Sequence, residues 1–206
     1  MTTTQRFRTS LVCATAIGAL ALSGCSSGDG GETAASSTSS ASASSSESAT
    51  STTPPATAGP GPDADLATAR FPVDLDRALS VAEQTLPGGT VTKIELEFDR
   101  SGNAWVWKID SQQNTDQHEI KVDAVSARVI ADDRDQESAN PRAVDPRKLT
   151  PKDALGKATA LVPGSVAEWA LEWDDGVQRY TVDVRTSGTD TQDVAVDVDT
   201  GTATRK

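Results

Sequence analysis

Cysteine and histidine are nearly absent from this chain of 206 residues, which has two cysteines and one histidine. Cys13 lies inside an amino-terminal apolar run, so the rest of the chain holds only Cys25 and cannot form an internal disulfide. Val122 stands where the second histidine of a His-Glu-x-x-His zinc motif beginning at His118 would be. We therefore expect no zinc site and no histidine-based catalytic triad, and we interpret His118 as a surface residue of a strand.

The apolar run Leu11–Leu22 is too short to span a bilayer, which takes ~20 apolar residues. It follows two arginines and precedes small residues, a pattern typical of an export signal. The segment Leu22-Ser23-Gly24-Cys25 resembles the bacterial lipobox, in which the chain is cut before a cysteine that then carries the lipid. We predict a lipoprotein signal peptide at 1–24 and lipidation of Cys25. A diacylglyceryl group with N-acylation would anchor the protein to the outer side of the cell membrane.

Large apolar residues are also missing from 26–62, which is built almost entirely of Ser, Ala, Thr, Gly and Pro. Such a segment cannot bury enough surface to offset the entropy of ordering. We assign 25–65 to the lipidated Cys25 and a disordered tether, with a reach of roughly 30–35 Å.

Basic residues are few: 19 Lys and Arg stand against 30 Asp and Glu, giving a net charge of −11. Most of the negative charge falls after residue 62. This balance argues against nucleic acid and anionic lipid headgroups as partners, and it fits cationic peptides, basic protein surfaces or divalent ions. The alternative interpretation is that the acidity serves only solubility.

An internal repeat organises the remainder of the chain. Four blocks recur in order at shifts of 74–76 residues, the first being Ala78-Leu79 and Pro87-Gly88, matched by Ala154-Leu155 and Pro163-Gly164. The other blocks pair Ile94, Leu96 and Phe98 with Trp169, Leu171 and Trp173; Trp105, Trp107 and Ile109 with Tyr180, Val182 and Val184; and Ile120, Val122 and Asp123 with Val194, Val196 and Asp197. The sequence therefore predicts a duplicated module.

Each copy begins with a helix signal, in which Asp74 and Thr150 are the expected N-caps and Pro-Gly ends the helix. Three runs of alternating apolar and polar residues follow, as in half-buried strands. We predict an α+β protein with two tandem α-β-β-β modules, each one helix on a small antiparallel sheet, at 66–135 and 148–206, joined by a linker at 136–147. Because modules of this size are only marginally stable alone, we expect them to pack together or to pair through strand edges.

All four tryptophans fall on predicted strands, and alternation favours core filling over an aromatic platform for a ligand. The Asp133, Asp135 and Glu137 spacing fits the start of an EF-hand, but Ser138 and Val144 stand where glycine and glutamate are required. A weak calcium site at Asp174-Asp175 and Asp197/Asp199 stays open as an alternative to ordinary turn aspartates.

The repeat resembles the PepSY family, and the second copy carries the pattern best. Its segments are Pro163-Gly164, Tyr180-Thr-Val182-Asp-Val184 and Val196-Asp-Val-Asp-Thr-Gly201. The first copy departs from the pattern with Trp105 in place of tyrosine and Ser126-Ala127 in place of Thr-Gly. The resemblance implies binding and restraint of peptidases, or assistance in their folding, with no catalytic residue attached to the module.

Together these observations predict a membrane-anchored binding or regulatory lipoprotein outside the cytoplasm, with a protein or peptide partner, no enzymatic activity, no cofactor and no metal site. The alternatives are a structural or calcium-buffering envelope protein and a hydrolase that uses carboxylates alone.

Overall fold

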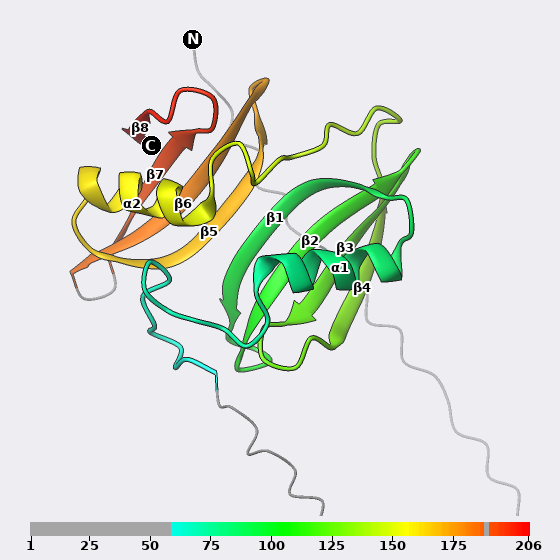
Figure 1. Ribbon diagram of the computed structural model, residues 1–206, viewed down its shortest axis with the longest axis horizontal. Helices are drawn as coiled ribbons and strands as arrows, with labels where there is room; N and C mark the ends of the chain where they lie inside the picture. Colours follow the sequence, from blue (N-terminus) through cyan, green and yellow to red (C-terminus); the bar gives the residue numbers. More distant parts are fainter. Residues whose placement is uncertain (1–58, 188–189) are drawn as a thin grey trace, which may run out of the picture. The chain divides into compact units, whose positions relative to one another are not determined.

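The computed structural model describes residues 59–187 and 190–206 (Figure 1). The predicted signal peptide, Cys25 and most of the predicted tether lie outside the described residues. Neither of the described helices is long and apolar enough to cross a membrane.

Two helices begin where the sequence predicts. Helix α1 (Leu75–Thr85) is N-capped by Asp74, whose side chain accepts a hydrogen bond from the Arg77 N–H at 2.9 Å. Helix α2 (Pro151–Leu161) is capped by Thr150, which accepts from the Asp153 N–H at 3.2 Å. Each cap satisfies a backbone donor that the first helical turn would otherwise leave unpaired.

Within residues 59–187 and 190–206, eight strands form one antiparallel sheet, in the order β4-β3-β2-β1-β5-β6-β7-β8. The strands are β1 Thr90–Asp99, β2 Ala104–Gln113, β3 Asp116–Asp123, β4 Val129–Gln136, β5 Ser165–Asp174, β6 Val177–Ser187, β7 Asp190–Asp197 and β8 Ala203–Arg205. The predicted mixture of one helix and antiparallel strands in each module is confirmed, but the prediction of three strands per module missed one strand in each. Each module adds a fourth strand, and the two sheets join into one.

The modules join edge to edge through β1 and β5, where Ile94, Glu95 and Leu96 face Leu171, Ala170 and Trp169. Glu95 and Ala170 are equivalent positions of the repeat, so the two strands are related by a local two-fold axis between them. Without this pairing, both modules would expose a strand edge with unpaired backbone groups. The expectation that the modules pair through strand edges is confirmed.

Both helices cover the same face of the sheet, as Figure 1 shows. Beneath them lie the predicted apolar positions, including Ile94, Ile109, Tyr180 and Val182, all with 0% of their surface exposed. Trp105, Trp107 and Trp169 are buried in this layer as well, which confirms core filling for three of the tryptophans. Trp173 is only partly buried, and the Arg142 guanidinium lies 3.5 Å from the centre of its ring.

The segments before and between the modules are bound to both of them. Asp65 accepts a hydrogen bond from the Val166 N–H at 2.8 Å, and the Arg185 guanidinium donates to the Asp63 carbonyl at 2.9 Å. The predicted tether therefore extends too far, because its last residues contact strands of the second module. In the predicted linker, Val144 is buried and its N–H donates to the Val91 carbonyl at 3.0 Å.

Candidate functional site

His118 lies on β3 as predicted, but it is buried rather than on the surface, with 7% of its area exposed. Its Nδ1 lies 2.8 Å from a carboxylate oxygen of Asp132 on β4. The sequence prediction omitted β4, the strand that covers this position. The short distance to Asp132 identifies His118 as a paired structural residue.

The aspartates considered for calcium serve turns and ion pairs. Asp174 binds Arg179 at 2.8 Å, and Asp199 binds Lys148 at 3.2 Å. Asp197 accepts the Thr200 N–H at 2.7 Å, and this backbone hydrogen bond lowers the pKa of its carboxyl group. Among the described residues, these aspartates do not form a group of three acidic ligands.

The face of the sheet opposite the helices is strongly charged. Since residues alternate between the two faces of a strand, the positions between the core residues all point to this side. Carboxylates outnumber basic side chains there by about two to one; the residues include Glu95, Glu97, Asp110, Glu119, Asp133, Glu168, Glu172, Asp183 and Asp193, with Lys93, Lys108, Lys121, Arg179 and Arg185. Much of the net negative charge of the folded part therefore gathers on one side.

Three glutamates meet at the junction of the modules on this acidic face. Carboxylate oxygens of Glu95, Glu97 and Glu168 all lie within 4.8 Å of one another. Lys108 lies 3.1 Å from Glu95 and 3.5 Å from Glu97, and Lys93 lies 2.6 Å from Glu95. Lysines thus already neutralise two members of the cluster, which makes it a salt-bridge network rather than an evident cation site.

Several carboxyl groups of this face have raised pKa values. Burial, reinforced by the negative charge of Glu95, raises the pKa of Glu168 to about 7. Burial and the neighbouring Asp193 raise the pKa of Asp183 to about 6, and burial also raises that of Asp110 to about 6. The face therefore gains negative charge between about pH 5 and 8.

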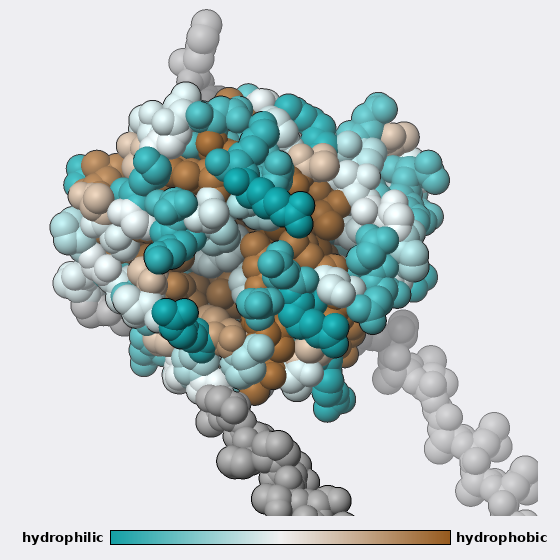
Figure 2. All heavy atoms as spheres, viewed as in Figure 1, coloured by the Kyte–Doolittle hydropathy of each residue, from teal (hydrophilic) through white to brown (hydrophobic). Residues whose placement is uncertain are grey.

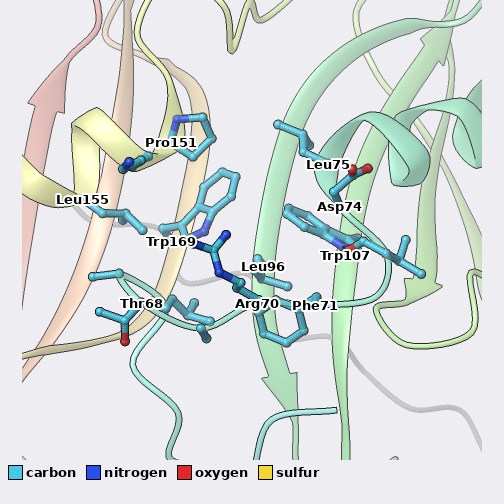
Figure 3. A pocket seen from close by; sticks show the side chains of 15 residues that line it. Thr68, Arg70, Phe71, Asp74, Leu75, Leu96, Trp107, Pro151, Leu155 and Trp169 are labelled. Atoms are coloured by element: carbon cyan, nitrogen blue, oxygen red, sulfur yellow. Dashed lines mark hydrogen bonds between the residues drawn. The ribbon is translucent and has the colours of Figure 1, made fainter. Parts of the chain in front are cut away.

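On the helix side, a pocket of about 540 Å³ opens where the two modules meet. Figure 2 shows apolar residues gathered in the hollows on this side, with hydrophilic residues at their margins. The walls of the pocket are formed by side chains from both modules and from the segment before α1. They include Leu66, Phe71, Leu96, Trp107, Leu155 and Trp169 (Figure 3). Trp107 and Trp169 meet edge to face, with 5.8 Å between ring centres.

Charged side chains stand at the rim of this seam pocket. Arg70 and Lys152 line it together with the N-cap Asp74. A second hollow, of about 680 Å³, shares Asp74, Leu75 and Pro151 with the pocket and continues alongside α1. Sequence reasoning missed the pocket because its residues come from positions as far apart as 66 and 169. The signal that the sequence did offer was the presence of tryptophans on predicted strands of both copies.

Both modules match the same protein-family model. A family model described as "Peptidase propeptide and YPEB domain" (PepSY) matches residues 72–133 and 148–206. A crystal structure of a candidate lipoprotein from Clostridium difficile 630 is similar in fold, with a TM-score of 0.59 and 22% sequence identity. The similarity covers 69% of this chain and 99% of that one. No curated protein matches the chain.

Proposed function

Since the chain belongs to the PepSY family, with two copies of the domain, we propose that it is a membrane-anchored regulatory lipoprotein that binds and restrains an envelope peptidase. The observation that carries the proposal is the joining of two family domains into one sheet with a broad acidic face. The anchor is the predicted lipid on Cys25, and the similarity in fold to a candidate lipoprotein agrees with it.

The acidic face is the surface that we assign to the partner. Neither helix of the described ranges covers it, and its charge favours a basic protein surface by electrostatic attraction. An interaction of this kind forms quickly at low salt and weakens as the salt concentration rises. We propose a non-enzymatic mode of action, in which the protein covers or holds the peptidase.

The test is chemical cross-linking in intact cells, followed by mass spectrometry of the partners recovered with the full chain. We expect an envelope peptidase among them, and slower peptide cleavage by that enzyme when the protein is added. Recovery of no envelope protein, or unchanged cleavage, would contradict the proposal. The same mass spectra test the anchor, because an unmodified Cys25 at the mature amino terminus would exclude lipidation there.

Charge variants test the surface. Asp133→Asn with Asp135→Asn removes two exposed carboxylates from the acidic face, and we expect weaker peptidase binding by roughly three- to tenfold at low salt. Asp76→Asn with Glu83→Gln removes the same charge from the exposed surface of α1 and serves as the control. If both double variants lost the same amount of peptidase affinity, binding would depend only on the net charge of the protein and not on the acidic face.

The alternative of a calcium-buffering protein makes a different prediction. Calorimetric titration with calcium would release or absorb heat, and Glu168→Gln would reduce the signal because this glutamate lacks a lysine within salt-bridge distance among the described residues. No heat on titration would dismiss that alternative.

A further inference from the structure

The seam pocket contains an indole N–H donor that has no partner among the described residues. Of the four tryptophans, three donate their indole N–H to a backbone carbonyl: Trp105 to Gly61 at 3.1 Å, Trp107 to Val73 at 3.0 Å and Trp173 to Ala143 at 2.9 Å. Trp169 is 3% exposed, yet its indole N–H has no acceptor among the described residues. No buried side-chain nitrogen or oxygen of the described residues lacks a partner, so this N–H is open to the pocket, where the acceptor of a bound molecule can reach it.

Two cations line the same pocket as that donor. Figure 3 draws the Arg70 guanidinium beside the Trp169 indole, in the pocket that both residues line. Lys152 lines the same pocket from the first turn of α2. Neither Arg70 nor Lys152 forms an ion pair or a side-chain hydrogen bond with another described residue. The Asp74 carboxylate, the only acid among the described residues of the lining, already accepts the Arg77 N–H.

The remaining walls are apolar. Leu66, Leu96 and Leu155 contribute aliphatic surface, while Trp107 and Phe71 contribute aromatic surface. A volume of about 540 Å³ is within the range of small-molecule sites, which runs from roughly 300 to 1,000 Å³. The pocket therefore offers an apolar cavity with an indole donor and two cationic groups.

We propose that the seam pocket binds an amphiphile with an apolar chain and an anionic head, of the class of medium-chain carboxylates. The carboxylate accepts hydrogen bonds from the Trp169 indole and the Arg70 guanidinium, and Lys152 adds attraction at the rim. The chain lies against Leu96, Leu155 and Trp107. This assignment goes beyond peptidase restraint and does not depend on it, because it uses the opposite side of the sheet.

The experiment uses the full chain carrying Cys25→Ser, which removes the predicted lipid and the need for detergent. Decanoate is titrated in while the four indole N–H signals are followed by NMR. The Trp169 signal is assigned as the one that is lost in Trp169→Phe. We expect this signal to shift most, and octanoate to bind roughly tenfold more weakly than decanoate because two methylenes are lost.

Head-group controls separate charge from apolar binding. We expect decanol and decylammonium to bind at least threefold more weakly than decanoate. We expect decanoate binding to weaken about three- to tenfold in Arg70→Gln and in Trp169→Phe, and decanol binding to stay unchanged in both variants. Arg77→Gln is the matched control, since Arg77 is an exposed cation of α1 outside the pocket lining, and it should leave decanoate binding unchanged.

Three results would overturn the proposal. The first is a Trp169 signal that does not move at saturating decanoate, and the second is equal binding of decanol and decanoate. The third is an equal loss of decanoate affinity in Arg77→Gln and Arg70→Gln. The first would also be the outcome if the pocket took only a peptide segment. Peptidase cross-linking is unaffected by any of these results, so failure here is distinguishable from failure of the proposed function.

Discussion

At the residue scale, single buried polar groups tie the modules to the segments around them. Tyr180 is fully buried, and its hydroxyl donates to the Leu149 carbonyl at 2.8 Å, just before α2. Gln178, on the same strand, donates to the Asp145 carbonyl at 3.2 Å. Each bond satisfies a polar group that would otherwise be costly to bury.

Tyr180 gives a direct optical prediction, because it is the only tyrosine in the chain. Burial raises the pKa of its phenol well above the ordinary value. Absorbance at 295 nm should therefore stay flat through pH 10–11 in the folded protein and rise near pH 10 in denaturant. Since the unfolded phenol loses its proton at lower pH than the folded one, stability should fall as the pH rises above about 10. A native titration centred near pH 10 would show that the hydroxyl is exposed.

Glu168 gives a prediction with a pH signature. Its pKa is raised to about 7, so the folded state holds the proton more tightly than the unfolded state does. The contribution of Glu168 to the free energy of unfolding is complete below about pH 4.5 and is lost as the pH rises towards 7. Glu168→Gln should therefore increase the free energy of unfolding at pH 8 by about 1 kcal/mol or less, and leave it unchanged near pH 4. Urea titration at both values tests this, and a stabilisation that is equal at pH 4 and pH 8 would contradict it.

At the element scale, the two helices show the same design with different caps. Both have three buried residues facing the sheet, mostly alanines, which lets the helices approach the large strand residues closely. The caps are Asp74 in one and Thr150 in the other, and each accepts a hydrogen bond from the third residue of its helix. The helix starts therefore follow from local sequence alone.

Replacing the cap of α2 tests this local contribution. Thr150→Ala should lower the free energy of unfolding by about 1 kcal/mol, because it leaves the Asp153 N–H without its acceptor. Thr150→Ser keeps a hydroxyl in place and should cost a few tenths of a kcal/mol at most. Urea denaturation followed by circular dichroism compares the two variants. If both variants lost the same free energy of unfolding, the methyl group of Thr150, and not its hydrogen bond, would be the source of the stabilisation.

At the scale of the whole molecule, the joined sheet makes the modules depend on each other. β1 and β5 pair across the junction, Trp107 and Trp169 touch beneath the helices, and Asp65 from before the first module binds β5 of the second. An isolated first module would lose all three contacts and expose β1 as an edge strand.

We therefore expect the full chain to unfold in one transition, with tryptophan fluorescence and circular dichroism giving the same midpoint in urea. A chain ending at residue 147 should unfold at a clearly lower urea concentration or aggregate, because β1 then lacks its partner. Two separate transitions in the full chain, or equal stability of the shortened one, would show that the modules fold independently.

The sequence by itself determined the repeat, the helix starts and the faces of the strands. These depend on residues close together in the chain, as with Thr150 and Pro151 or the alternation through Ile94, Leu96 and Phe98. Only the tertiary structure decided that Glu95 faces Ala170, that β4 buries His118, and that Arg70, Trp107 and Trp169 share one pocket. The reason is that strand neighbours and pocket walls are set by contacts between distant segments, and local patterns do not encode which open edge pairs with which.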